Sequence, residues 1–441
     1  MKENKTISGF SKLNKTQKIS WLEQQLGLDQ STGGFLSSFE VQDDQLQSII
    51  SDLSENHLSN FHLPFGVAPN FLVNGKMKVF PLVTEESSVV AALAKAAGFW
   101  ASRGGFHAEV TGMEKRGQVH FLWTGDPEKL IRVFPVIQKK LLADTFRFTR
   151  RMERRGGGIM HMDLNYLPGI LPHYYQIDAA FNTCDAMGAN FINSCLEQLG
   201  KSLCEFLSAQ ETWPQEERGC QVIMAILSNY TPGSRVRVWV ECAVEDLTGD
   251  NDVQASYEFA EKFIMAVHIA KHDVSRAVTH NKGIFNGVDA LALATGNDFR
   301  AIEAVGHAFA GRDGRYTGLS EARINGGQFV FSMELPLSVG VVGGVTAIHP
   351  MTKLAMQILE NPDARELMQY LAVAGLASNW SAVRALVTTG IQKGHMKMHL
   401  SNILAVLQAT DEQKQAARLY FHDRDVNFAD VEHYLKSYAG Q

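Results

Sequence analysis

The chain has 441 residues, of which 45% are hydrophobic and 20% charged, and its formal net charge is −6. This length exceeds that of one ordinary core, so we expect two or three domains. The negative charge argues against a nucleic-acid-binding protein. No apolar run is long enough to span a membrane, and the N-terminus lacks the apolar core of a signal peptide. Five cysteines without a CxxC pair favour a reducing cytoplasm over a disulfide framework.

The first third of the chain is predicted to be mainly helical before strands begin. Residues 1–50 read as polar helical segments. An alanine-rich helix follows from Ser88 to about Arg103, where Gly104 and Gly105 end it.

Residues 118–229 then alternate in the order β-α-β-β-α-β, which is typical of the ferredoxin-like split βαβ unit. Its expected elements are the strand GQVHFLWTG, a helix from Asp126 to about Leu142, the strands GIMHMDLNYL and YYQIDAAFN, the helix DAMGANFINSCLEQLGKSLCEFL and the strand QVIMAILSN. We expect this unit to form a discrete domain, residues 113–229, inserted into a larger domain made of 1–112 and 230–383.

The last part of the chain adds a strand, a long helix and a polar helical end. The strand is Arg235–Glu245, and residues 253–279 carry apolar side chains on more than one side, which predicts a buried central helix. Residues 384–441 lack a large apolar face, so they are expected to form a semi-detached segment. The predicted fold class is α+β: a large mixed α/β domain with a central helix, the inserted ferredoxin-like domain and a helical C-terminal segment.

Three polar residues are candidates for chemistry, each with a plain structural alternative. Lys282 in HNKGIFNG is either a solvated loop lysine, or a cation facing a developing oxyanion or a Schiff-base former. Asp298 in ATGNDFRAIE is either a helix N-cap or a carboxylate that pairs with Lys282. Glu86, before its helix, is either a carboxylate favoured by the helix dipole or a buried proton donor.

Two further segments are suited to binding phosphate groups. DAMGAN, residues 185–190, follows a strand and opens a helix, and Gly188 lets a ligand approach the backbone. It lacks the GxGxxG pattern, so a Rossmann site is not indicated, and an ordinary strand-to-helix turn explains it as well. One helical face also presents five guanidinium groups, which form either a solvated face or a phosphate-binding site. They belong to Arg147, Arg150, Arg151, Arg154 and Arg155.

Two histidines near the C-terminus, His395 and His399, stand four residues apart and would share one helical face. A zinc site would need a third ligand and usually the pattern HExxH, whereas this stretch reads HMKMH. Lys393 and Lys397 would also repel a metal cation, so we expect no metal here. A histidine after a glycine in a basic stretch can instead serve as a proton donor.

Six motifs together identify a family. TEESSVVAA, DAMGAN, HNKGIFNG, ATGNDFRAIE, LPLSVGVVGG and GIQKGHMKMHLSNI follow one another in an order that closely resembles hydroxymethylglutaryl-CoA (HMG-CoA) reductase of the bacterial class II type. The resemblance extends from about residue 55 to about residue 405. Departures from the family pattern are Ser59 for glycine, Ser87 for proline and Ser378 for glutamine.

The resemblance implies a function and a set of site residues. The catalytic residues would be Glu86, Lys282, Asp298 and His395, the last on a C-terminal flap comprising residues 384–441. The substrate-binding residues would be Ser88, Asn229, Arg276 and Asn286. The cofactor-binding residues would be Asp185, Met187, Gly188 and Asn190 in the inserted domain, with Arg150 or Arg151 on a 2′-phosphate.

The implied reaction interconverts HMG-CoA with mevalonate and coenzyme A through two hydride transfers from NAD(P)H. The arginine-rich helix predicts that NADPH is preferred, with NADH possible. A homodimer or larger homo-oligomer with shared active sites is implied, without nucleic acid, membrane or metal. The alternatives are a Schiff-base lyase and a non-catalytic acyl-CoA-binding protein. A Schiff-base lysine would be unpaired, and a binding protein would tolerate the loss of a catalytic residue.

Overall fold

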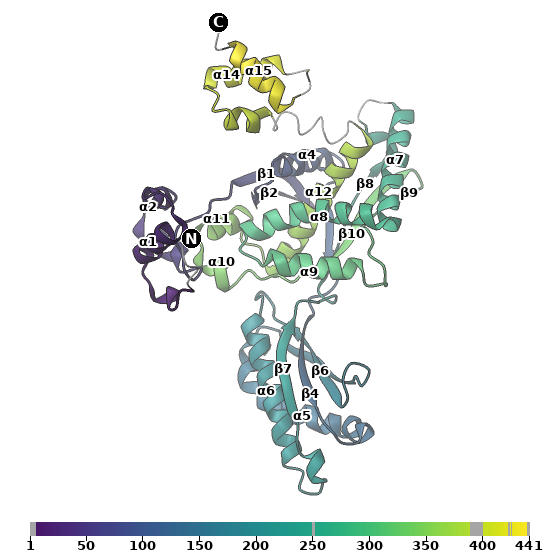
Figure 1. The fold of residues 1–441 in the computed structure, drawn as a ribbon. Coiled ribbons are helices and arrows are strands. Elements are labelled where there is room, and N and C mark those ends of the chain that lie inside the picture. The colour runs from purple at the N-terminus through teal and green to yellow at the C-terminus, as the bar shows by residue number, and fades with distance from the viewer. Residues whose placement is uncertain (1–5, 249–251, 389–399, 422–423, 425, 439–441) are drawn as a thin grey trace.

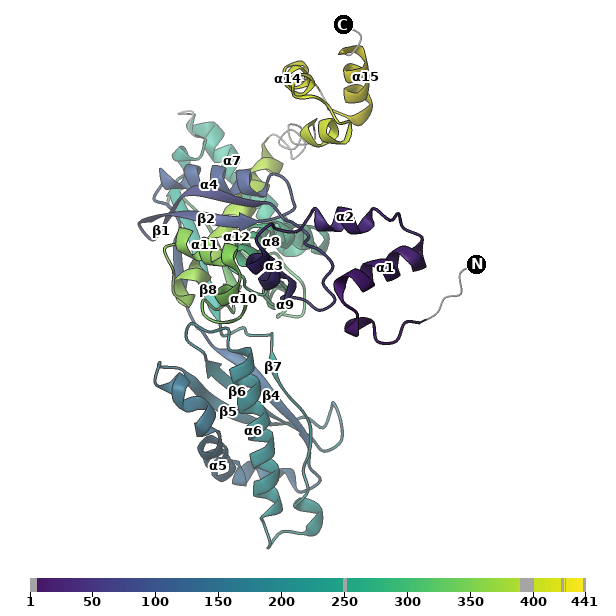
Figure 2. The ribbon, with the colours of Figure 1, turned by 90° about the vertical axis from the view of Figure 1, so that its left-hand side faces the viewer.

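A computed structural model describes residues 6–248, 252–388, 400–421, 424 and 426–438. Figures 1 and 2 show a central body of helices and sheets, a second body below it that contains β4 to β7, and C-terminal helices above it. The N-terminal helices lie beside the central body (Figure 1). This mixture of helices and sheets confirms the predicted α+β class. Within the described residues, no helix is both long enough and apolar enough to cross a membrane.

The described N-terminal residues form four α-helices and a β-hairpin. The side chain of Asn14 caps the first helix, and that of Asp43 caps the third. Asn74 and Gly75 join the two strands with φ angles of 49° and 79°, as a tight two-residue hairpin turn requires. These elements are α1 (Lys15–Leu26), α2 (Thr32–Ser37), α3 (Asp44–Ser51), β1 (Phe65–Val73), β2 (Lys76–Val83) and α4 (Val89–Ala101).

The central body contains an antiparallel sheet with the strand order β3-β8-β10-β9. Along β8 the buried side chains alternate, from Val236 to Val238 and Val240, so one face of the strand points into the core. The strands are β3 (His107–Val110), β8 (Arg235–Ala243), β9 (Ser320–Asn325) and β10 (Gln328–Pro336). The accompanying helices are α7 (Val253–His272), α8 (Val274–Ala294), α9 (Phe299–Ala310), α10 (Gly344–Ile348), α11 (Pro350–Ile358) and α12 (Ala364–Val387).

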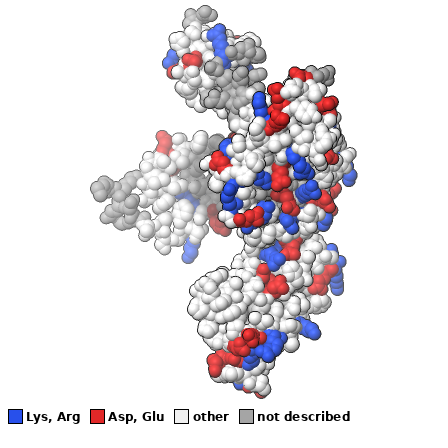
Figure 3. Space-filling view, turned by 90° about the vertical axis from the view of Figure 1, so that its right-hand side faces the viewer, with Lys and Arg blue, Asp and Glu red and all other residues white. Residues whose placement is uncertain are grey.

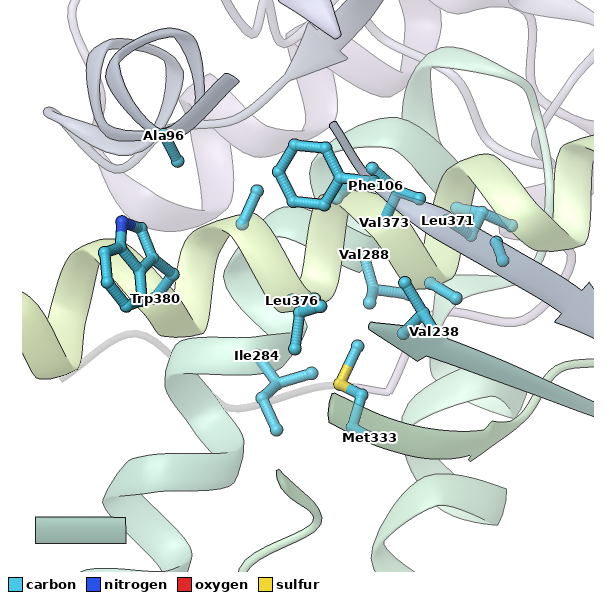
Figure 4. Close-up of a cluster of buried hydrophobic side chains, with 14 of the residues drawn as sticks. Ala96, Phe106, Val238, Ile284, Val288, Met333, Leu371, Val373, Leu376 and Trp380 are labelled. Atoms are coloured by element: carbon cyan, nitrogen blue, oxygen red, sulfur yellow. The ribbon is translucent and has the colours of Figure 1, made fainter. Parts of the chain in front are cut away.

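Helix α12 runs through the core and packs closely against α8 and the sheet (Figure 4). Trp380, two turns before the end of α12, is 1% exposed, and Leu376 is fully buried between α8 and the sheet. A side chain at Gly287 of α8 would put a Cβ 2.3 Å from the carbonyl oxygen of Ala374. Only glycine therefore permits this approach of the two helices. The contact fixes α8, which carries Lys282.

The single helix predicted over residues 253–279 is wrong in its extent. The structure divides this region into α7 and α8, with Asp273 between them in an extended conformation. The carboxylate of Asp273 accepts a hydrogen bond from Ser275 N at 2.9 Å and thereby caps α8. Among the described helices α12 is the most completely buried, so the central helix of this fold lies later in the chain than predicted.

The second body has the predicted β-α-β-β-α-β order. Its antiparallel sheet has the strand order β5-β6-β4-β7, so β6 lies between β4 and β5 as a split βαβ unit requires. Side chains of the two helices and the sheet share one buried cluster. The elements are β4 (Lys115–Leu122), α5 (Pro127–Glu153), β5 (Gly158–Tyr166), β6 (Tyr174–Asn182), α6 (Ala189–Ser208) and β7 (Gln221–Ser228). Helix α5 continues beyond the predicted end at Leu142 and includes most of the arginine-rich stretch.

The C-terminal helices have a small hydrophobic cluster of their own. Leu404, Ala417, Val431 and Leu435 are buried together there. The helices include α14 (Asp411–Tyr420) and α15 (Phe428–Tyr438). The predicted limit at residue 384 falls within the last turn of α12, which continues to Val387.

Charged side chains of both signs are mixed on the face of the molecule shown in Figure 3. Lys and Arg side chains lie among Asp and Glu side chains there, rather than forming one continuous basic surface. This face therefore offers no broad electrostatic attraction to a polyanion.

Candidate active site

The centre of the candidate site is an ion pair between Lys282 and Glu86. Lys282 lies on α8, and Glu86 lies in the segment that joins β2 to α4. Asn286, one helical turn after Lys282, donates a hydrogen bond of 3.4 Å from Nδ2 to Oε1 of Glu86. The side chains of Lys282 and Glu86 are 55% and 40% exposed, so the cation and the carboxylate are open to a substrate. An exposed ion pair adds at most about 1 kcal/mol of stability, so this pair contributes little to the stability of the fold.

A buried hydrogen-bond network holds α8 in place immediately before Lys282. Asn281 is fully buried. Its amide donates to the hydroxyl of Tyr316 at 3.0 Å and to the carbonyl of Thr317 at 2.9 Å, and its oxygen accepts from Leu319 N at 2.9 Å. A buried amide whose hydrogen bonds are all formed fixes the position of its helix, because a shift of the helix would leave a buried polar group without a partner.

Ser378, one of the departures from the family pattern, takes part in the packing of α12 on α8. Its hydroxyl donates a hydrogen bond of 2.7 Å to the carbonyl oxygen of Gly283. Gly283 directly follows Lys282, so this serine supports the backbone of the site. The structure therefore gives this departure a positioning role.

The chain enters α4 through a strained residue. Ser88 has a φ of 76°, in the left-handed region that non-glycine residues seldom adopt. Such a conformation costs on the order of 1 kcal/mol and is often found at functional sites. It lies two residues after Glu86, so it shapes the turn that holds Glu86 toward α8.

Asp298 does not form the ion pair with Lys282 that the sequence suggested. It caps α9 by accepting a hydrogen bond of 3.2 Å from Ala301 N, and it pairs with Arg300 at 3.3 Å. Among the described residues, the carboxylate that pairs with Lys282 is that of Glu86. A side chain at a helix N-cap is directed to its own helix, which explains this alternative pairing.

Other predicted site residues lie apart from this cluster or outside the described residues. Within the described part of the chain, no hydrogen bond or ion pair joins Arg276 or Asn229 to Glu86 or Lys282. Arg276 is half-buried on α8, and Asn229 is exposed after β7. His395 lies outside the described residues.

The segment predicted to bind the cofactor, residues 185–190, is held against the central body. Asp185 accepts a hydrogen bond of 3.0 Å from Ala364 N through Oδ1, and one of 2.8 Å from Val341 N through its carbonyl. Gly188 has a φ of 85°, and a Cβ there would lie 2.4 Å from Thr183. This position therefore requires glycine. Because glycine has no side chain, nothing on this residue blocks access to its backbone.

The remaining predicted cofactor residues follow at the start of α6. Asn190 lies exposed in the first turn of α6, and Met187 is half-buried. A Cβ at Gly340 would lie 2.3 Å from the backbone nitrogen of Met187. The glycine-rich stretch from 339 to 344 therefore packs backbone against backbone here.

Lys115 is a residue of this region that the sequence analysis did not single out. It is 4% exposed, and its Nζ donates to Thr183 Oγ1 at 2.7 Å and to the carbonyls of Ala186 and Met187 at 2.8 and 3.0 Å. Burial lowers the pKa of Lys115 to about 8. This ammonium group holds the turn from Thr183 to Gly188 in shape. The sequence held one signal for this role, because Lys115 occupies a position of an alternating strand at which the side chain points inward.

The two arginines predicted to contact a phosphate lie at the end of α5. Arg150 and Arg151 are exposed in its last turn. No carboxylate among the described residues lies within ion-pair distance of either guanidinium group. Arg147, by contrast, donates a hydrogen bond of 2.7 Å to Gln198.

A partly buried carboxyl group, Asp289, follows Asn286 by three residues on the same helix face. Burial raises the pKa of Asp289 to about 8, with further contributions from Glu303 and Glu85. Its Oδ1 is buried and has no hydrogen-bond partner among the described residues. The carboxyl group is therefore held protonated near neutral pH.

Replacing Asp289 by asparagine is expected to stabilise the fold above neutral pH. The folded chain keeps this proton to about pH 8, whereas an aspartate with the ordinary pKa of 3.8 loses it far earlier. The unfolded state thus binds fewer protons, and the wild-type free energy of unfolding falls as pH rises between these values. The variant lacks this titration, so its advantage should reach about 2–4 kcal/mol near pH 8. Denaturant-induced unfolding of the wild type and the variant near pH 5 and near pH 8 measures this difference in stability.

Asp313→Asn is the matched control, because the side chain of Asp313 is 82% exposed. It should leave the pH dependence of stability unchanged. An Asp289→Asn chain whose stability varies with pH as steeply as the wild type would contradict the burial argument.

Comparison with known proteins agrees with these features. The chain matches the family model for hydroxymethylglutaryl-coenzyme A reductase over residues 16–400. It is 33% identical to the 3-hydroxy-3-methylglutaryl-coenzyme A reductase of Archaeoglobus fulgidus over 411 residues, which are 92% of this chain and 88% of that protein. It is 32% identical to a probable reductase of Borreliella burgdorferi over 368 residues, covering 82% and 80% of the two chains.

A solved structure has a similar fold. The class II 3-hydroxy-3-methylglutaryl-CoA reductase of Streptococcus pneumoniae, bound to NADPH in open conformations, superposes with a TM-score of 0.72 and 37% identity. The similarity covers 87% of this chain and 100% of that chain. The resemblance inferred from six short motifs is thus confirmed over residues 16–400. The chain belongs to the hydroxymethylglutaryl-coenzyme A reductase family.

Proposed function

We propose that this chain is an HMG-CoA reductase that interconverts HMG-CoA with mevalonate and free coenzyme A, using two molecules of NADPH. The observation that carries the proposal is the cluster of Lys282, Glu86 and Asn286, which brings a cation, a carboxylate and a hydrogen-bond donor together at one open surface. Family membership supplies the substrate. The cofactor supplies a hydride in each of two steps.

The chain's own residues would stabilise charge and move protons during these steps. Hydride addition to the thioester carbonyl leaves an oxyanion, which the ammonium group of Lys282 stabilises. Collapse of the resulting hemithioacetal breaks the carbon–sulfur bond, and His395 gives a proton to the leaving thiolate of coenzyme A. When the aldehyde is reduced in the second step, Glu86 would give a proton to the aldehyde oxygen as it becomes the alcohol. Asp298 is proposed as the further acid of this centre.

The substrate and cofactor would occupy different parts of the chain. We propose that Ser88, Asn229, Arg276 and Asn286 bind the hydroxymethylglutaryl group. Residues 113–229 would form the dinucleotide-binding domain, residues 1–112 and 230–383 the substrate and dimerisation domain, and residues 384–441 the flap. Separate clusters of buried side chains in the first two units support this division.

The segment from Asp185 to Asn190 fits a dinucleotide. Its turn opens the 20-residue helix α6, whose N-terminal N–H groups favour a pyrophosphate. The backbone at Gly188 carries no side chain that would obstruct a ligand. We propose Asp185, Met187, Gly188 and Asn190 as the residues of this site.

An activity assay separates the proposal from its two rivals. The purified chain should consume NADPH only when HMG-CoA is present, and it should release coenzyme A. An acyl-CoA-binding protein would bind HMG-CoA without consuming NADPH. A Schiff-base lyase would be trapped covalently on Lys282 by borohydride in the presence of a carbonyl substrate, and its activity would not depend on NADPH.

We further propose that the active unit is a homodimer or larger assembly with shared active sites. The half-exposed Lys282 and Glu86 support this, because catalysis of hydride transfer requires a site from which water is excluded. A second copy of the chain can cover them. Light scattering coupled to gel filtration should give at least twice the monomer mass of 48.8 kDa. A monomer that retains full activity would contradict this.

The cofactor preference makes a further prediction. The double variant Arg150→Ala/Arg151→Ala should weaken the binding of NADPH roughly ten- to a hundredfold and leave the binding of NADH almost unchanged. Loss of a charge-assisted contact costs about 1.5–3 kcal/mol, and only NADPH carries the 2′-phosphate that these arginines would contact. Steady-state kinetics with each cofactor measure the change.

Arg132→Ala is the matched control because Arg132 is also exposed on α5, near the opposite end of the helix. It removes the same charge, and it should have only a small effect on the binding of NADPH and NADH, equal for the two cofactors. A wild-type enzyme that clearly prefers NADH, or a double variant with equal losses for both cofactors, would contradict the arginine assignment.

A further inference from the structure

Two thiols of the second body lie close together. Cys204 is in the last part of α6, and Cys220 directly precedes β7. Their Sγ atoms are 2.8 Å apart, and both side chains are partly buried. This separation exceeds the length of a disulfide bond by only about 0.75 Å. Both cysteines are free in the structure.

The two cysteines are brought together by well-packed elements (Figure 2). Asn193, near the start of α6, accepts a hydrogen bond of 2.9 Å from Leu227 N of β7. Farther along α6, a Cβ at Gly200 would lie 3.4 Å from Cγ2 of Val222. Helix and strand therefore run past each other in opposite directions at close range, and Cys204 meets Cys220 at the end of this contact.

The segment between the two cysteines is tied to the rest of this body. The indole Nε1 of Trp123 donates a hydrogen bond of 2.7 Å to the carbonyl of Glu217, and Lys129 forms an ion pair with the carboxylate of Glu217. Lys129 also lies 4.0 Å above the ring of Trp213. These contacts hold the chain that leads into Cys220, so the thiols meet without rearrangement of the loop.

The pair has the asymmetry that thiol exchange requires. The hydrogen bond between the two sulfur atoms lowers the pKa of Cys204. The same hydrogen bond, together with burial, raises the pKa of Cys220. Cys204 is therefore the thiol that ionises more readily, and its thiolate is the reactive form.

We propose that Cys204 and Cys220 form a thiol modification site that reacts with low-molecular-weight disulfides such as glutathione disulfide. The Cys204 thiolate attacks one sulfur of the disulfide, forms a mixed disulfide and releases one thiolate. Cys220 then loses its proton and attacks Sγ of Cys204, which closes the protein disulfide and expels the second thiolate. The two protein thiols lose two electrons, and the reagent gains them as it becomes two thiols.

This site is distinct from the one proposed for catalysis. Cys204 lies fifteen residues after the first residue of α6, a distance of about 22 Å along the helix axis. The segment from Asp185 to Asn190 lies at the other end. The proposal therefore does not depend on the proposed reductase activity.

The test treats the full-length chain with glutathione disulfide and measures its intact mass and its non-reduced peptide map. We expect a mass loss of two hydrogens, a cross-link between the peptides of Cys204 and Cys220, and reversal by dithiothreitol. Cys220→Ser should stop the reaction at a glutathione adduct on Cys204, because the second thiol is absent. Cys204→Ser should react much more slowly, because Cys220 alone lacks a lowered pKa.

Cys184→Ser is the matched control, since Cys184 is a partly exposed thiol whose pKa is raised by burial. It should leave the yield of the cross-link unchanged. Thermal unfolding of each serine variant verifies that it is folded. A wild-type chain that keeps both thiols open to alkylation after treatment, or that accumulates a stable mixed adduct without a cross-link, would overturn the proposal.

Discussion

Replacing Lys282 by alanine is expected to abolish the reduction of both HMG-CoA and mevaldehyde, with turnover lowered at least about 10²–10³-fold. Each hydride addition creates an oxyanion, and Lys282 is the cation that faces Glu86 and Asn286 at the open surface of α8. Both hydride steps should therefore fail together. Steady-state and single-turnover rates with each substrate measure the loss.

The fold of this variant should be unaffected. The Lys282–Glu86 pair is exposed and contributes at most about 1 kcal/mol to stability, so the unfolding transition should hardly move. Lys262→Ala removes another exposed lysine, from α7, and should leave turnover unchanged. A Lys282→Ala enzyme that reduces mevaldehyde at the wild-type rate would refute the assignment.

Replacing His395 by glutamine is expected to separate the two substrates. Only the thioester route expels a thiolate that needs a proton, so reduction of HMG-CoA should slow by roughly 10²–10⁴-fold. Reduction of free mevaldehyde should proceed almost normally. Histidine suits this role because its ordinary pKa of about 6.5 lies near working pH. Initial rates with the two substrates, compared in one preparation, measure the difference.

His399→Gln is the matched control, because His399 stands four residues later and is not assigned a proton to transfer. It should affect the two substrates alike. Equal losses on both substrates for His395→Gln would give this histidine another role. A requirement of the wild-type enzyme for added zinc would restore the metal interpretation of the two histidines.

The elements with strong local signals were predictable from the sequence. The ferredoxin-like body was found because its strands alternate and its helices have clear starts, such as Asp126 before Pro127, which cap α5 in the structure. The end of α5 was placed too early, at about Leu142, although the sequence has no helix breaker before Gly156.

Long-range packing explains what local patterns could not predict. Glycines near Lys282 suggested a loop, yet Lys282 lies in the middle of α8. Gly287 is needed where α12 crosses α8, so it serves packing rather than a turn. The division of α7 from α8 had a local signal in Asp273, a typical N-cap, but the surrounding apolar periodicity concealed it.

The motifs predicted which residues make up the candidate site, but they did not predict which of these residues contact one another. Glu86, Lys282 and Asn286 were named together, and the structure brings them together. The partner of Lys282 was not predictable, because the choice between Glu86 and Asp298 depends on how the turn at Ser88 approaches α8. The role of Lys115 depends likewise on backbone carbonyls that come from distant parts of the chain.

The stoichiometry of the complete reaction tests the central claim most directly. Purified chain is given a limiting amount of HMG-CoA and excess NADPH, and NADPH consumed, coenzyme A released and mevalonate formed are measured in the same sample. The proposed mechanism predicts two NADPH consumed for each coenzyme A and each mevalonate. Consumption of one NADPH per coenzyme A with mevaldehyde as the final product, or release of coenzyme A without consumption of NADPH, would contradict it.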